Sequence, residues 1–151
     1  MSGRIFATPQ DAEAAFYEAL ERADLEGMMA VWAEDEEIVC VHPAGPRIAG
    51  LAEVRASWAR IFSGGGGTRV LITHRVETSG VMQAVHSLHE NFTAAAGEPP
   101  PAPVVATNVY LRGAGGWRMI VHHASPAPQP PAAQAERRSG APRSDAPKTL
   151  H

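Results

Sequence analysis

Four strand-like runs in the second half of the chain constrain its fold more than any other feature. Residues 68–77 and 81–93 meet at a Thr-Ser-Gly turn, and residues 104–112 and 117–124 meet at Gly-Ala-Gly-Gly. All four runs are rich in β-branched and other apolar residues. Short glycine-containing turns join antiparallel neighbours into hairpins. The pattern predicts an antiparallel meander.

The first half of the chain carries helical patterns instead. Thr8 and Pro9 suit the N-cap and first turn of one helix, and Asp24 can cap a short second helix. Residues 51–62 carry a third amphipathic pattern, and residues 36–43 form a β-rich run between the second and third helices. Helices followed by an antiparallel meander predict a single α+β domain.

Composition and charge limit the classes of partner. Hydrophobic residues make up 44% of the 151 residues, enough for one core. We expect no membrane segment or secretory signal, because no apolar run approaches the ~20 residues that span a bilayer. The single cysteine, Cys40, cannot form an internal disulfide, and we expect a cytoplasmic protein. Residues 1–124 carry nine basic and fourteen acidic side chains, a net charge of −5 that disfavours nucleic acid.

The last part of the chain differs in composition from the rest. Residues 126–151 are rich in proline and alanine, and Leu150 is their one large aliphatic residue. Such a segment buries too little apolar surface to offset its ordering entropy. We predict a domain over residues 1–125 and a disordered tail over residues 126–151, either a solubilising extension or a polyproline ligand.

Two segments resemble a known family. They are residues 23–50, ADLEGMMAVWAEDEEIVCVHPAGPRIAG, and the final hairpin, VVATNVYLR followed by GGWRMIVHHAS. Over residues 8–125 the chain resembles the NTF2-like superfamily, and its SnoaL-like domains in particular. The superfamily includes ketosteroid isomerase, polyketide cyclases and the association domain of calmodulin-dependent kinase II. The resemblance implies a cone in which three N-terminal helices pack on a strongly curved, mostly antiparallel sheet, with a pocket between them.

The resemblance also places individual residues. The general base of the isomerase falls on His42, the acid of its oxyanion hole on Asn108, and its helical phenol on Phe16, with Tyr17 turned ~100° away. The isomerase groups are therefore changed or lost, although His42 as a base and Asn108 as a donor remain chemically reasonable. The inward arginines of the association domain are not preserved, since their positions correspond to Glu90, Asn108 and Ala124.

Strand alternation predicts which side chains share the pocket. Asn108 and Tyr110 point the same way, together with Ala106 and Arg112. On the preceding strand one face carries a glutamate among mostly apolar neighbours, and we take it as inward: Met82, Ala84, His86, Leu88, Glu90 and Phe92. His122 and His123 must face opposite ways unless a bulge intervenes, and the sequence leaves open which one faces inward.

Three residues are candidates for catalysis, each with a structural alternative. His42 is a general base or a histidine that fixes the turn before proline. Glu90 is an acid or base with a raised pKa, or it forms a salt bridge with Arg75 or Arg112. Asn108 donates a hydrogen bond to a carbonyl oxygen, or it ties strands together.

Six further side chains are candidates for ligand binding, with core packing as the alternative. They are Phe16, Trp32, Trp58, Tyr110, His122 and His123. No cofactor or metal is expected: the glycine run at 64–67 lacks a following Lys-Ser/Thr, and no GxGxxG follows a strand. His42 and Glu90 with His122 or His123 give only a weak 2-His-1-carboxylate pattern.

Two functions remain open. The first is a bacterial, cytoplasmic homodimer whose pocket binds a small, largely apolar molecule with a carbonyl or hydroxyl group. Its chemistry would be cofactor-free proton transfer, as in isomerisation, cyclisation or dehydration. The second is a non-catalytic association or ligand-sensing module that dimerises through the outer sheet face, where Val105, Val109 and Leu111 lie.

Overall fold

Three helices pack on one six-stranded sheet in the computed structural model, which describes residues 3–66, 68–94 and 96–128. The predicted α+β class is confirmed. The helices are α1 (Pro9–Arg22), α2 (Leu25–Val31) and α3 (Leu51–Phe62). Among the described residues, none of the helices has the length and apolar character to cross a membrane. Most of the predicted tail lies outside the described residues.

The predicted helix starts are confirmed by their caps. The Thr8 hydroxyl accepts a hydrogen bond from the Asp11 N–H, and the Asp24 carboxylate accepts one from the Gly27 N–H. Each side chain satisfies a backbone donor that has no partner within the first turn. Ala23, in the left-handed region at φ 51°, ends α1, and only Ala23 and Asp24 connect it to α2.

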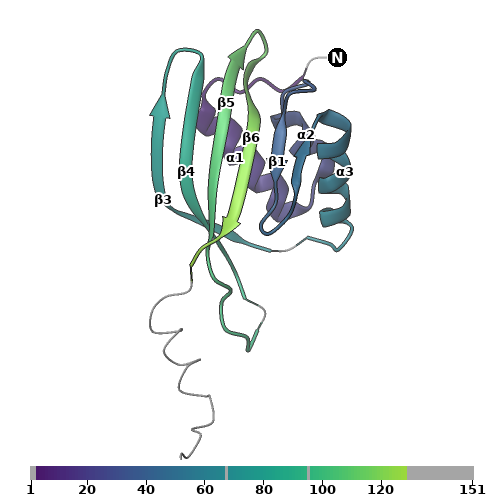
Figure 1. Ribbon diagram of the computed structural model, residues 1–151, viewed down its shortest axis with the longest axis vertical. Coiled ribbons are helices and arrows are strands. Elements are labelled where there is room, and N and C mark those ends of the chain that lie inside the picture. Colours follow the sequence, from purple (N-terminus) through teal and green to yellow (C-terminus); the bar gives the residue numbers. More distant parts are fainter. Residues whose placement is uncertain (1–2, 67, 95, 129–151) are drawn as a thin grey trace, which may run out of the picture.

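The sheet contains the predicted meander plus two short strands (Figure 1). Its order is β2-β1-β6-β5-β4-β3, and every pair is antiparallel except β1 with β6. The sequence predicted that the first hairpin turn begins at Thr78. In the structure β3 continues to Ser79, and the turn begins after it. The strands are β1 (Val39–Val41), β2 (Arg47–Ala49), β3 (Val70–Ser79), β4 (Gln83–Phe92), β5 (Val104–Gly113) and β6 (Gly116–Pro126).

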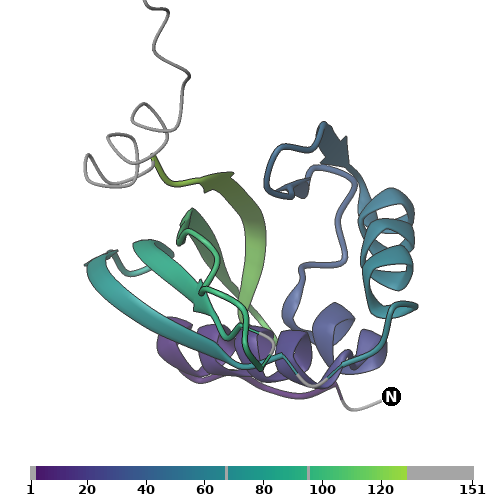
Figure 2. The same ribbon diagram turned by 90° about the horizontal axis from the view of Figure 1, so that it is seen from below.

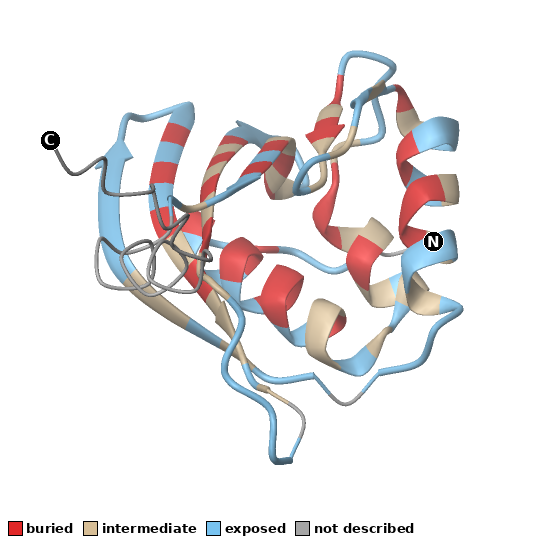
Figure 3. Cartoon of the chain, turned by 60° about the horizontal axis from the view of Figure 1, so that its bottom comes forward, coloured by how far each residue is buried: buried red, intermediate tan, exposed pale blue. Residues whose placement is uncertain are grey.

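The sheet curves over α1, and α3 lies on the far side from β3 (Figure 2). Burial alternates along β4, as the red and blue bands of Figure 3 show. The predicted inward face is confirmed for Ala84, His86, Leu88 and Glu90, and on β5 for Ala106, Asn108 and Tyr110. It is wrong for Met82 and Arg112, which are exposed because they lie at the hairpin ends of the sheet.

A β-bulge in β6 decides which of the adjacent histidines faces inward. The register with β5 skips Ile120. Trp117 and Met119 are buried before the bulge, and His122 is buried after it. Uninterrupted alternation would have buried His123 instead, and His123 is exposed. The two histidines face opposite ways, as predicted.

A second bulge interrupts the pairing of β3 with β4 between Thr73 and Val76. His74, within it, has a positive φ of 54°. The neighbouring Arg75 side chain reaches the buried carboxylate of Glu13 on α1. The bulge therefore connects the edge of the sheet to the first helix.

Gly116 is the position where an added side chain should cost most. It has φ 94°, and a Cβ there would lie 2.5 Å from the backbone oxygen of Phe6. We expect Gly116→Ala to lower the free energy of unfolding by about 2 kcal/mol or more, from backbone strain and this clash. Gly113→Ala, where a Cβ meets nothing within 4 Å, is the control and should change it by about 0.5 kcal/mol or less. Urea unfolding measures both, and equal effects would contradict the prediction.

Candidate functional site

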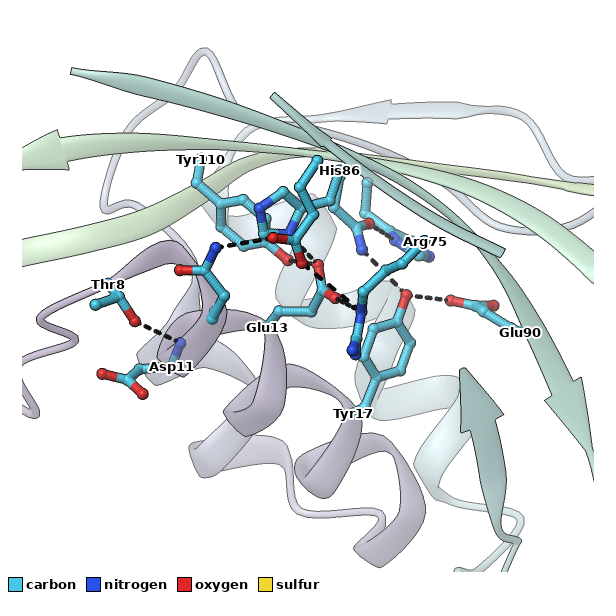
Figure 4. A network of polar contacts seen from close by, with 12 residues as sticks. Thr8, Asp11, Glu13, Tyr17, Arg75, His86, Glu90 and Tyr110 are labelled. Atoms are coloured by element: carbon cyan, nitrogen blue, oxygen red, sulfur yellow. Dashed lines mark hydrogen bonds and ion pairs between the residues drawn. The ribbon is translucent and has the colours of Figure 1, made fainter. Parts of the chain in front are cut away.

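A row of hydrogen-bonded side chains crosses the interior from β6 to β4 (Figure 4). His122 Nδ1 lies 2.6 Å from Asn108 Oδ1, and Asn108 Nδ2 donates to the Tyr17 hydroxyl over 3.0 Å. The Tyr17 hydroxyl donates to Glu90 Oε2 over 2.7 Å. We name these four buried residues the interior network. It joins α1 to three adjacent strands.

The hydrogen bonds of the interior network run in one direction. The amide oxygen of Asn108 can only accept, so His122 Nδ1 carries a hydrogen and donates it. The amide nitrogen of Asn108 can only donate, so the Tyr17 hydroxyl is free to donate to Glu90. The Glu90 carboxyl group is the final acceptor. The network is therefore arranged around this one acidic group.

Burial raises the pKa of Glu90 to about 7, and the negative charge of Glu13 adds to the increase. The hydrogen bond from Tyr17 opposes it. Burial, followed by the charge of Glu90, raises the pKa of Tyr17 above its ordinary range, so the phenol remains a donor. Near neutral pH both forms of Glu90 are populated, which suits a group that accepts and releases protons.

Glu90 forms neither of the salt bridges considered from the sequence. Arg75 instead lies 3.1 Å from a carboxylate oxygen of Glu13 and 3.9 Å from one of Glu77. Arg112 is exposed, and no ion pair joins it to an acidic residue in the described part of the chain. The interior carboxyl group has a phenol, not a cation, as its partner.

Burial lowers the pKa of His122 to about 3, and the nearby His42 and His123 add to the effect. The unfolded chain would take up this proton near pH 6.5, so lowering the pH from 6.5 toward 3 favours unfolding. For this one group, the free energy of unfolding changes by at most ~1.4 kcal/mol per pH unit. The raised pKa of Glu90 acts the opposite way between 4.5 and about 7, where the folded state holds the extra proton.

Replacing His122 with asparagine should reduce this loss of stability in acid. The amide N–H can still donate to Asn108, but the side chain no longer titrates. Urea unfolding of both proteins between about pH 3 and 6.5 measures the effect, and we expect the wild type to lose more stability. Parallel curves for the two proteins would show that His122 does not carry the pH dependence.

His42 lies beside the interior network, in a different hydrogen-bonded group. Its Nε2 is 3.0 Å from the Ser57 hydroxyl, which itself donates to the Val54 carbonyl over 2.7 Å. Because the Ser57 hydrogen is committed, His42 Nε2 carries a hydrogen and Nδ1 holds the lone pair of the neutral ring. Burial, with a contribution from Arg60, lowers the pKa of His42. His42 is therefore a neutral base near neutral pH.

Aromatic rings connect His42 to the interior network. The Trp58 ring meets the His42 ring edge-on at 4.7 Å and lies 6.1 Å from that of His122. The centre of the Phe16 ring lies 4.8 Å from that of His122 and 5.6 Å from that of Trp58. The structure thus brings the catalytic candidates His42, Glu90 and Asn108 into one region with the ligand-binding candidates Phe16, Trp58 and His122.

A second buried group forms around Glu13 on α1. Its Oε2 lies 2.5 Å from His86 Nδ1 and accepts from the Tyr110 hydroxyl over 3.1 Å. Its Oε1 accepts from Arg75 Nε over 3.1 Å, and Arg75 also approaches Glu77. We name these residues the Glu13 cluster. Tyr110, a ligand-binding candidate, belongs to this cluster.

Glu13, Glu77 and His86 bring potential metal-ligand atoms within 4.8 Å of one another. The Arg75 guanidinium already pairs with the Glu13 carboxylate and approaches that of Glu77, so a metal ion there would compete with a resident cation. Among the described residues, His42 and Glu90 do not form a potential metal-binding group with His122 or His123.

Residues 10–129 match the family model of the SnoaL-like domain. The chain belongs to this family. As a SnoaL-like domain it matches a solved structure from Thiobacillus denitrificans, a "putative calcium/calmodulin-dependent protein kinase type II association domain". The identity is 40%, with a TM-score of 0.77, over 83% of this chain and 99% of that one.

Two other relatives broaden the picture of this SnoaL-like domain. A "putative dehydratase" of the NTF2-like family from Streptomyces avermitilis is 33% identical, with a TM-score of 0.70, over 78% of this chain and 92% of that one. The F-box protein SKIP8 of Arabidopsis thaliana is 26% identical over 110 residues, 73% of this chain and 46% of that protein. The chain thus spans about half the length of this curated relative. The predicted fold and family are confirmed.

Two ligand-binding candidates lie apart from the SnoaL-like site. His123 is exposed on the opposite face of the sheet, and Trp32 lines a cleft outside the network. Phe16 carries no phenol, as expected, but the neighbouring Tyr17 is also buried and brings a phenol to Asn108 and Glu90. The sheet wraps α1 widely enough to bury both residues. The signal for this face of α1 in the sequence is the i, i+4 spacing of Glu13 and Tyr17.

Proposed function

We propose that this SnoaL-like domain binds a small, largely apolar molecule with a carbonyl or hydroxyl group and catalyses proton transfer to or from carbon. The single observation that carries the proposal is the buried Glu90 at the end of the interior network. A carboxyl group with a pKa near neutrality exchanges protons readily at physiological pH. Isomerisation and dehydration both begin with such a step.

In the proposed reaction the Glu90 carboxylate removes a proton from the carbon next to a carbonyl. The negative charge moves to the carbonyl oxygen, which needs a hydrogen-bond donor. Tyr17, held by Asn108, is that donor once protonated Glu90 releases its hydroxyl. Glu90 then returns the proton to another carbon, completing an isomerisation, or to a leaving hydroxyl group, which departs as water.

The remaining site residues have supporting roles in this proposal. Neutral His42 offers a lone pair at Nδ1 that can accept a hydrogen bond from a substrate hydroxyl. Phe16 and Trp58 provide apolar surface for the body of the substrate. The description of the Streptomyces avermitilis relative as a putative dehydratase supports this class of reaction.

Deuterium exchange tests the proposal without knowledge of the natural substrate. The protein is incubated in D₂O with cyclohexanone, a β,γ-unsaturated ketone and a β-hydroxyketone, and mass spectrometry follows deuterium uptake at carbon. We expect exchange of at least one probe to exceed that in buffer. Exchange of every probe at the buffer rate, with no probe shifting the indole N–H resonance of Trp58, would contradict the proposal.

We also propose, as a second candidate function, that copies of the chain associate through the outer face of the sheet. Val85 is 37% exposed there, and Val105 and Val109 on β5 are half-buried. A relative described as a putative association domain supports this reading. Assembly and catalysis are compatible, because the interior network lies on the opposite face.

Native mass spectrometry tests the association. We expect a homodimer that Val109→Asp converts to a monomer, because the new charge would be buried at the interface. His42→Ala, on the inner side, is the control and should leave the dimer intact. A wild-type protein that is monomeric at micromolar concentration would overturn this second candidate.

A further inference from the structure

A cleft of about 960 Å³ lies outside the interior network. The N-terminal segment, α2, the start of α3 and the β5–β6 hairpin line it. Its apolar wall includes Met29, Leu111 and Ile120. This volume is typical of sites for small organic ligands.

The cleft gathers more positive than negative side chains. Four arginines line it, and one of them, Arg55, is paired with Glu26. The acidic residues in its lining are Glu26, Glu34 and Asp35, and Asp35 accepts a hydrogen bond from the Glu37 N–H. No carboxylate lies within ion-pair distance of the remaining arginines in the described part of the chain; these are Arg4, Arg112 and Arg118.

Arg118 is held in place by groups that do not neutralise it. It donates to the backbone oxygens of Trp117 and Arg4. Its guanidinium lies 5.0 Å from the centre of the Phe6 ring, and that of Arg4 lies 5.2 Å from the same ring. Two positive groups are therefore fixed close to one aromatic ring, and Glu34 acts on Arg118 only from beyond ion-pair distance, an arrangement that favours an anion.

Trp32 adds an unused donor to the same cleft. It is 1% exposed, and its indole N–H has no hydrogen-bond partner among the described residues. A buried donor without a partner is costly, and a ligand oxygen would relieve this cost. The observation is independent of the arginines and favours a ligand that carries an acceptor oxygen, as a carboxylate does.

We propose that this cleft binds a small organic carboxylate with an apolar body, separately from the proton-transfer site. The carboxylate is held by the guanidinium groups that lack an acidic partner, and an oxygen accepts from the Trp32 indole. The apolar body lies against Met29, Leu111 and Ile120. The inference does not rest on the proposed catalytic function, because it uses none of the interior residues.

The three tryptophans allow the site of binding to be read directly. Trp32 reports on the cleft and Trp58 on the interior, while Trp117 lies elsewhere in the core. The ¹⁵N-labelled full chain is titrated with benzoate and octanoate, and with benzamide as the neutral match of benzoate. Trp32→Phe assigns the cleft resonance. We expect benzoate or octanoate to shift the Trp32 indole signal saturably. Benzamide should bind at least about tenfold more weakly than benzoate.

Arginine variants test the charge requirement. Arg112→Gln and Arg118→Gln should each weaken binding of the carboxylate about tenfold or more. Arg47→Gln, an exposed arginine on β2 outside the cleft, makes the same change in net charge and should leave binding unchanged. If Arg118→Gln proves unstable, the exposed Arg112 decides the matter.

Four results would overturn the proposal. The first is that neither acid shifts the Trp32 signal. The second is that Arg47→Gln weakens binding as much as Arg112→Gln does. Alternatively, the acids shift Trp58 and lose affinity in Glu90→Gln, which would place them in the interior. A Trp32 shift that depends on protein concentration without added acid, together with a dimer mass, would mean that a second copy covers the cleft.

Discussion

Replacing Glu13 with alanine is expected to destabilise the domain by about 3–5 kcal/mol, because two buried donors lose their acceptor at about 1–3 kcal/mol each. The carboxylate accepts hydrogen bonds from His86, Tyr110 and Arg75, and the first two side chains are fully buried. Without Glu13, these two donors lose their acceptor and have no water to replace it. Urea unfolding at neutral pH measures the loss.

Two further variants separate the buried interaction from general effects of charge. Glu77→Ala removes the exposed acid of the same cluster and should cost about 1 kcal/mol or less, because solvent screens its pairing with Arg75. Glu13→Leu combined with His86→Phe removes donor and acceptor together, so part of the stability should return. A Glu13→Ala protein no less stable than Glu77→Ala would contradict this account of the cluster.

Replacing Glu90 with glutamine is expected to reduce proton exchange on the responsive ketone probe about 100-fold or more. Glutamine keeps the shape of the side chain and an oxygen that accepts from Tyr17, but it cannot take up the proton. In the wild type the rate should rise with pH and level off above about 7, as Glu90 becomes ionised. Initial rates between pH 5 and 9 measure both effects.

Glu98→Gln makes the same chemical change at an exposed position and is the matched control. His42→Ala decides between the two candidate bases, since we expect it to reduce the rate less than Glu90→Gln does. Loss of exchange in His42→Ala with full activity in Glu90→Gln would transfer the role of base to His42.

Much of the fold could be predicted from the sequence because periodic patterns determine it. The alternation of β4 and β5 correctly placed Glu90, Asn108 and Tyr110 inward. The caps at Thr8 and Asp24 correctly marked the starts of two helices. These features depend on residues close together in the chain.

The bulges could not be predicted, because a bulge depends on which residue a neighbouring strand leaves unpaired. Ile120 resembles the apolar residues around it, yet skipping it turns His122 inward and His123 outward. The irregularity beside Arg75 likewise connects β3 to Glu13 without any glycine or proline to mark it.

The role of Tyr17 was missed for a different reason. A helix on a flat sheet buries one narrow stripe, and Tyr17 lies ~100° from Phe16. Here the curved sheet covers a wider arc of α1, so both residues are buried. Trp32 is buried, as its apolar character suggests. Nothing in the sequence, however, indicates that it lines a separate cleft.

The measurement that tests the central claim most directly is the pKa of Glu90 in the folded protein. Carbon-13 NMR of side-chain carboxyl groups follows each glutamate across a pH titration, and Glu90→Gln assigns the signal. We predict that one carboxyl resonance titrates near pH 7 and is absent from the variant. A Glu90 signal that titrates near its ordinary value of 4.5 would contradict the claim that the interior network surrounds a proton-exchanging acid.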